Sequence, residues 1–302
     1  MSLNRTVTEG RNPATTNIDT LATREIVGLI AAEDAKVAPA VAAVGDAIAR
    51  LADIVAERIG RGGRLIYIGA GTSGRLGVLD AAECPPTFGV DSSLVVGLIA
   101  GGATALTEAI EAVEDDVALG ASHIAGRDVG PDDVVLGIAA SGRTPYVLGG
   151  IGEARRRGAF VAGLACAESS PLEAAVDLMI APIVGPEVIS GSTRMKAGTA
   201  QKLVLNTLST TVMIRLGKTF GNLMVDVQPT NEKLRWRAAG IVATATGLSF
   251  DEAQRLLEAA SYEAKTAVVM ALANVDAEAA RRRLAISAGH VRRALAEGQA
   301  NG

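Results

Sequence analysis

Five short apolar runs alternate with helical segments between Arg64 and Val184, and this alternation constrains the fold more than any other feature of the chain. Helices inserted between apolar strands are typical of a parallel sheet that is covered on both faces. The sequence therefore predicts an α/β fold with a five-stranded parallel sheet. The expected strands are residues 65–68, 94–99, 134–138, 160–165 and 178–184, and the expected helices are 75–83, 104–119, 145–157, 169–176 and 194–217.

The segments on either side of the sheet region are predicted to be helical. Helical apolar spacing covers residues 18–59, after a polar arm at 1–17. Beyond the sheet region, Ser249 and Glu252 form a capping box that predicts the start of a helix. The expected parts are residues 1–60 as an N-terminal arm with helices, 61–230 as the sheet domain, and 231–302 as a small C-terminal helical bundle.

Composition argues against several classes of protein. The chain has 302 residues, 49% of them hydrophobic, which is enough for a large core. A net charge of −4 argues against a nucleic-acid partner. No apolar run is long enough to span a membrane, and the N-terminus lacks the apolar region of a signal peptide, so we expect a cytoplasmic protein with no membrane partner. Two cysteines and two histidines argue against a disulfide framework and a catalytic zinc ion.

The first strand leads into a glycine-rich loop, residues 69–74, and a helical pattern follows. Backbone N–H groups and the dipole of the following helix make such a loop a site for an anion, and a phosphate is the expected guest. The loop also matches the dinucleotide fingerprint, which requires an acidic residue at the end of the second strand. Residues 100–102 are Ala-Gly-Gly at that point, so we expect no nicotinamide cofactor.

Two more loops rich in hydroxyl groups follow later strands, at residues 141–145 and 190–194. Because parallel strands end at the same edge of a sheet, the three loops are expected to form one polar pocket. A single serine more often caps a helix than binds a ligand, so the prediction depends on the three loops together. The predicted binding residues are Gly71, Thr72, Ser73, Ser141, Gly142, Arg143, Thr144, Ser190, Ser192, Thr193 and Lys196.

Two glutamates are candidates for proton transfer. Glu83 shares a helix face with the leucines four and seven positions earlier, which is the face expected to be buried, and residues 84–86 (Cys-Pro-Pro) are expected to end that helix. Burial at a helix C-terminus favours a carboxyl group that carries a proton. Glu114 borders the apolar stripe of the expected helix 104–119. The alternatives are a structural hydrogen bond for Glu83 and a boundary position for Glu114.

Six blocks of the sequence resemble the N-acetylmuramic acid 6-phosphate etherase family, within the larger group of sugar isomerase (SIS) domains. The blocks cover most of residues 8–235 in the expected order. Those at 80–87 and 191–199 are the most specific, whereas the loop at 141–145 alone would indicate only the broad SIS group. The blocks are 8–12 (TEGRN), 69–77 (GAGTSGRLG), 80–87 (DAAECPPT), 140–146 (ASGRTPY), 191–199 (GSTRMKAGT) and 220–226 (FGNLMVD).

The resemblance implies a SIS fold and a cofactor-free lyase. Such an enzyme removes D-lactate from the C3 ether of N-acetylmuramic acid 6-phosphate, leaves N-acetylglucosamine 6-phosphate, and acts in amino-sugar catabolism and cell-wall recycling. The family pattern assigns the acid/base role to Glu83 and a second catalytic role to Glu114, and it implies a homodimer with sites near the subunit interface. The alternatives are an aldose–ketose isomerase of a sugar 6-phosphate and a non-catalytic sensor like the glucokinase regulatory protein. Release of lactate distinguishes the etherase from both.

Overall fold

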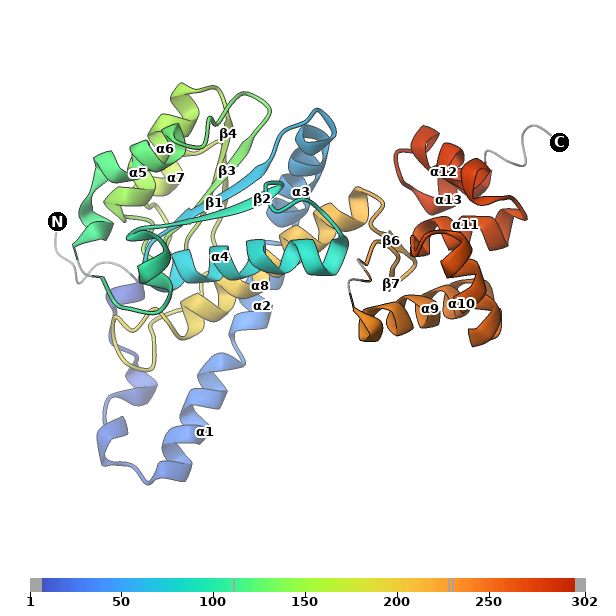
Figure 1. The fold of residues 1–302 in the computed structure, drawn as a ribbon. Coiled ribbons are helices and arrows are strands. Elements are labelled where there is room, and N and C mark those ends of the chain that lie inside the picture. Colours follow the sequence, from blue (N-terminus) through green and yellow to red (C-terminus); the bar gives the residue numbers. More distant parts are fainter. Residues whose placement is uncertain (1–6, 111, 228, 230, 297–302) are drawn as a thin grey trace. The chain divides into compact units, whose positions relative to one another are not determined.

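The computed structural model describes residues 7–110, 112–227, 229 and 231–296. The chain divides into two compact units (Figure 1). The first unit contains the residues up to Ala82 together with Ser93–Ser209, and the second contains Glu83–Ser92 together with the residues from Thr210 onward. Within these described residues, none of the helices is both long and apolar enough to cross a membrane.

The first unit is built on a five-stranded parallel sheet with the strand order β2-β1-β3-β4-β5, which confirms the predicted α/β fold. Gly69, the last residue of β1, lies opposite both Ile99 of β2 and Ile138 of β3. These three strands therefore end at the same level, and the loops that follow them share one edge of the sheet. The strands are β1 (Leu65–Gly69), β2 (Val95–Ile99), β3 (Val134–Ile138), β4 (Phe160–Leu164) and β5 (Leu178–Ile180).

Helices cover both faces of this sheet, as Figure 1 shows. On one face, Ile66 and Ile68 of β1 pack in a core with residues of α5 (Val117–Ala125) and α6 (Pro145–Arg156). On the other face lies the first part of α4 (Gly71–Phe88), where a Cβ atom on Gly77 would lie 3.1 Å from Cβ of Tyr67. The short α7 (Pro171–Ala175) precedes β5, and α8 (Lys196–Arg215) follows it.

The N-terminal segment is helical, as the spacing over 18–59 predicts. Its longer elements are joined to the sheet region: α3 contacts β5, and Glu33 at the end of α1 forms a buried ion pair with Lys196 of α8, with 2.5 Å between Oε2 and Nζ. Burial raises the pKa of Glu33, but hydrogen bonds from Lys196 and Lys36 outweigh it and lower that pKa to about 2. The elements are η2 (Val7–Glu9), η3 (Pro13–Thr15), η4 (Ile18–Thr20), α1 (Thr23–Asp34), α2 (Val37–Ala42) and α3 (Gly45–Gly60).

The expected helix over 104–119 is wrong. The structure has two short 3-10 turns there, η5 (Gly102–Leu106) and η6 (Val113–Asp115), and α5 begins only at Val117. Ala112 has a left-handed backbone with φ 66°, which interrupts a helix, and the carboxylate of Asp116 accepts a hydrogen bond from the N–H of Leu119 at 2.8 Å. Asp116 is thus an N-cap, and it starts a new helix at the point where the apolar stripe suggested continuity.

The predicted end of α4 at Glu83 is also wrong, because the helix contains Pro85 and Pro86 and runs to Phe88. Each proline lacks an N–H group, so the carbonyl oxygens of Ala81 and Ala82, four residues earlier, lose their helical donors, yet the helix continues past both prolines. Gly89 ends the helix instead: its φ is 63°, and its N–H donates to the carbonyl oxygen of Pro85 at 2.9 Å.

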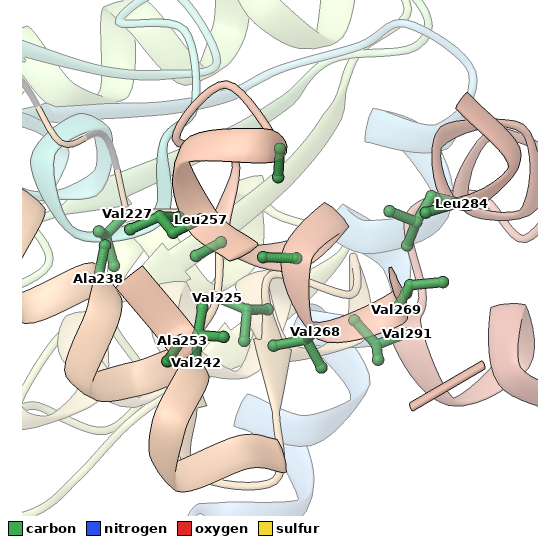
Figure 2. Packing of buried hydrophobic residues seen from close by; sticks show 14 of the residues in the cluster. Val225, Val227, Ala238, Val242, Ala253, Leu257, Val268, Val269, Leu284 and Val291 are labelled. Atoms are coloured by element: carbon green, nitrogen blue, oxygen red, sulfur yellow. The ribbon is translucent and has the colours of Figure 1, made fainter. Parts of the chain in front are cut away.

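The second unit is a helical bundle with a core of small apolar side chains. Figure 2 shows Val225, Val242, Leu257, Val268 and Leu284 in that core. The predicted capping box is confirmed at the start of α10, where the side chain of Ser249 accepts from the N–H of Glu252. The elements are β6 (Thr219–Phe220), β7 (Leu223–Met224), α9 (Glu232–Thr246), α10 (Phe250–Ala259), α11 (Ala264–Ala273), α12 (Ala277–Ile286) and α13 (Val291–Ala296).

Candidate functional site

A cavity of about 510 Å³ lies where β1 and β3 end, wholly within the first unit. Its volume is in the range of sites for small molecules. All three predicted loops contribute to it, together with a segment before α5 and one residue near the N-terminus. The lining residues are Glu9, Ala70, Gly71, Thr72, Ser73, Glu114, Asp115, Ala140, Ser141, Arg143, Thr144, Pro145 and Thr193.

Two helix N-termini open onto this cavity. Helix α4 begins at Gly71 and α6 begins at Pro145, so the partial positive charge at each N-terminus lies beside the cavity. Gly71 has φ 53°, and a Cβ atom there would meet nothing within 4 Å, which leaves its backbone accessible. Thr144 is the N-cap residue of α6, yet within the described structure its side chain makes no capping bond. The arrangement suits an anion such as a phosphate.

The glycines of the first loop have a packing role of their own. A Cβ atom on Gly74 would lie 2.7 Å from the carbonyl oxygen of Gly69, and one on Gly69 would lie 2.8 Å from the backbone nitrogen of Gly74. Neither position accepts a side chain, so the start of α4 can lie directly against the end of β1. The hydroxyl of Ser73, which lines the cavity, donates to Oε1 of Gln201 on α8 at 2.9 Å.

The third loop is arranged differently from the other two. The carboxylate of the buried Glu187 accepts hydrogen bonds from the N–H groups of Lys196 at 3.0 Å and Ala197 at 2.9 Å. The protein itself therefore places an anion at the N-terminus of α8. From this loop Thr193 lines the cavity, whereas the side chain of Lys196 is 1% exposed and pairs with Glu33.

Four of the predicted binding residues are not among the described residues that line the cavity: Gly142, Ser190, Ser192 and Lys196. A Cβ atom on Gly142 would lie 2.4 Å from Oγ of Ser170, so close packing requires the glycine. The hydroxyl of Ser190 donates to the carbonyl oxygen of Gly10 at 3.2 Å, which ties this loop to the N-terminal segment.

The cavity carries more carboxylates than the sequence indicated. Glu114 and Asp115 come from η6, Glu9 comes from η2, and all three side chains are exposed. Arg143 is the only cationic side chain among the described lining residues. Glu9 and Asp115 were not predicted. Glu9 belongs to the TEGRN block, which indicated a family resemblance but carried no assigned role, and Asp115 follows Glu114 in a segment that was expected to be helical.

Glu83 is exposed, so its predicted burial is wrong for this chain by itself. Leu79, one turn earlier, is 54% exposed, which shows that the face once expected to be buried lies toward solvent. Glu83 and Ser73 are ten positions apart on the same helix. At 1.5 Å per residue, the two positions are about 15 Å apart along the helix axis.

The fold and the cavity define the chain as a SIS-domain protein. A family model described as the N-terminal SIS domain of glucokinase regulatory protein matches residues 47–155, and one for the C-terminal lid domain of that protein matches residues 221–269. A phosphoheptose isomerase from Neisseria gonorrhoeae has a similar structure, with a TM-score of 0.50 and 18% identity over 63% of this chain and 98% of that one. At this identity the likeness concerns the fold alone.

Curated relatives define the family more narrowly. A protein named N-acetylmuramic acid 6-phosphate etherase 2 from Vibrio parahaemolyticus is 55% identical over 98% of both chains. An N-acetylmuramic acid 6-phosphate etherase from Streptomyces avermitilis is 55% identical over 96% of this chain and 93% of its own length. One from Caldanaerobacter subterraneus is 52% identical over 98% of this chain and 96% of its own length. The chain belongs to the N-acetylmuramic acid 6-phosphate etherase family.

Proposed function

We propose that this protein cleaves the D-lactyl ether of N-acetylmuramic acid 6-phosphate to give N-acetylglucosamine 6-phosphate and D-lactate. The observation that carries the proposal is the 55% identity, over 98% of the chain, to a relative named for this substrate. The cavity supports it, because the N-termini of α4 and α6 offer a place for the phosphate, and Glu114, which can transfer protons, also lines the cavity. We also propose that the reaction takes place in the cytoplasm, where a charged sugar phosphate is retained because it does not cross a membrane unaided.

The elimination and the addition of water each require two proton transfers, and neither is a redox step. The open-chain sugar has an aldehyde at C1, which acidifies the proton at C2. A base removes that proton, a double bond forms between C2 and C3, and the C3–O bond to lactate breaks while an acid protonates the leaving oxygen. Water then adds its oxygen to C3 and a proton returns to C2. Two carboxyl groups whose protonation states alternate are sufficient for this sequence. We assign these roles to Glu83 and Glu114.

Helix geometry bears on how Glu83 reaches the substrate. A phosphate held at Ser73 is about 15 Å along α4 from Glu83 of the same chain, a distance greater than the length of a glutamate side chain. We therefore propose a homodimer in which the second copy supplies Glu83. Leu79, one turn before Glu83, is 54% exposed, so this part of α4 is accessible to a second copy.

The first test is a lactate assay with N-acetylmuramic acid 6-phosphate. The wild-type protein is expected to release lactate, and Glu114→Gln is expected to lower turnover by about 100-fold or more, which is the usual contribution of a general acid or base. Glu108→Gln is the matched control, because Glu108 is exposed but does not line the cavity in the described structure. Conversion of the sugar phosphate without lactate would instead indicate an isomerase, and binding without conversion would indicate a sensor.

The second test mixes two inactive variants, Glu83→Gln and Glu114→Gln, under conditions that allow subunits to exchange. In a mixed dimer one of the two sites receives an intact Glu114 from one chain and an intact Glu83 from the other. Random exchange then restores about a quarter of the wild-type activity, since half of the dimers are mixed and each holds one intact site. If both glutamates act within one chain, mixing restores nothing. Light scattering on the same samples reports whether the protein is a dimer.

A further inference from the structure

The segment formed by residues 7–16, here called the N-terminal arm, is fixed to the loop at 186–191. The side chain of Asn12 donates to the carbonyl oxygen of Pro186 at 3.3 Å. The hydroxyl of Thr15 donates to the carbonyl oxygen of Val188 at 2.8 Å. In a third hydrogen bond the donor belongs to the loop: the hydroxyl of Ser190 donates to the carbonyl oxygen of Gly10 in the arm at 3.2 Å. Asn12 and Thr15 are both buried. The arm is therefore held by three hydrogen bonds to a loop that lies some 175 residues later in the sequence.

These contacts bring Glu9 to the cavity. A Cβ atom on Gly191 would lie 3.2 Å from Oε2 of Glu9, so the carboxylate lies over Gly191, two residues before Thr193 in the cavity wall. Thr8, next to Glu9, is 2% exposed, and its hydroxyl has no hydrogen-bond partner among the described residues. The turn that carries Glu9 is thus anchored at Thr8 and Gly10, while the carboxylate itself stays exposed in the cavity.

The charges around the cavity restrict what Glu9 can bind. The described lining residues include three carboxylates, Glu9, Glu114 and Asp115, and one guanidinium group, that of Arg143. A carboxylate next to a bound phosphate is repelled by it. The phosphate is favoured at the N-termini of α4 and α6, so Glu9 is left to accept hydrogen bonds from uncharged donors on the rest of the ligand.

We propose that Glu9 binds the sugar part of the ligand, by accepting a hydrogen bond from a hydroxyl or the acetamido N–H of an amino-sugar phosphate. Its role is to position the sugar, while the helix N-termini bind the phosphate. This inference rests on the proposed function for the identity of the ligand. It adds a substrate contact from the N-terminal arm and gives the contacts between the arm and residues 186–191 a functional consequence.

The test compares Glu9→Ala and Glu9→Gln with Asp19→Asn, a matched control that removes one negative charge from an exposed position nearby that does not line the described cavity. A hydrogen bond to a charged group is lost in Glu9→Ala, so the KM for N-acetylmuramic acid 6-phosphate is expected to rise about 10- to 100-fold. Glu9→Gln keeps a neutral acceptor and is expected to show a smaller rise. Asp19→Asn is expected to match the wild type.

The inhibition constant of inorganic phosphate separates positioning from general damage to the site. Phosphate alone fills only the anion site, so its inhibition constant is expected to stay the same or to fall slightly in both Glu9 variants. Equal weakening of phosphate and substrate, or an unchanged KM in Glu9→Ala, would overturn the proposal. If the wild type releases no lactate, the proposed function fails, and calorimetry with N-acetylglucosamine 6-phosphate and inorganic phosphate tests Glu9 separately: Glu9→Ala must weaken only the sugar phosphate.

Discussion

At the scale of single residues, the ion pair between Glu33 and Lys196 is the most buried ion pair described in the first unit. Its side chains are 4% and 1% exposed. Glu33→Ala leaves the Lys196 ammonium buried without that carboxylate, so the free energy of unfolding is expected to fall by about 3–5 kcal/mol. Lys36→Met removes a second partner of Glu33; because the Lys36 side chain is 59% exposed, this change is expected to cost less than about 1 kcal/mol. Denaturant titration of both variants measures the difference, and similar losses would contradict it.

The same residues show why some site residues were predictable and others were not. Ser141 and Thr193 line the cavity because a hydroxyl that follows a parallel strand lies at the carboxyl edge of the sheet, and the sequence alone shows that position. Lys196 follows the same pattern, but its partner Glu33 lies 163 positions earlier. Glu9 likewise reaches the cavity only through contacts with a distant loop. No local pattern contains such pairings, so charge and spacing alone could not assign them.

At the scale of elements, the junction between β1 and α4 sets the geometry of the anion site. Gly74→Ala would place Cβ 2.7 Å from the carbonyl oxygen of Gly69 and 2.7 Å from Cγ1 of Ile99. Such overpacking is expected to cost about 1–3 kcal/mol and to shift the first turn of α4, which weakens inhibition by inorganic phosphate. Gly28→Ala in α1 is the control, since its Cβ meets nothing within 4 Å and alanine favours a helix. If Gly74→Ala is as stable as the wild type and is inhibited by phosphate equally well, this explanation of the junction is wrong.

Elements were predictable where one local signal decided them. The apolar runs correctly indicated the five parallel strands, and the capping box marked the start of α10. The region 104–119 failed because its apolar spacing suits a helix, whereas the N-cap at Asp116 and the left-handed Ala112 divide it. Arg75 adds a constraint from outside the segment, as its guanidinium donates to the carbonyl oxygen of Glu108 at 2.9 Å. A side chain more than 30 residues away thus helps to hold a loop where periodicity predicted a helix.

At the scale of the whole molecule, the pH dependence of stability tests whether the buried ion pair forms in solution. The pKa of Glu33 is about 2 in the folded chain, against 4.5 for an ordinary glutamate. Between these pH values the Glu33 carboxylate binds more protons in the unfolded state than in the folded state. The stabilisation that the ion pair contributes is therefore present above pH 4.5 and is lost as the pH falls toward 2. The free energy of unfolding of the wild type is therefore expected to fall more steeply with decreasing pH in this window than that of Glu33→Gln, which has no proton to bind there. Denaturant titrations at pH 5, 4 and 3 measure both slopes. Parallel slopes would mean that Glu33 titrates normally in the folded protein and that the pair with Lys196 does not form.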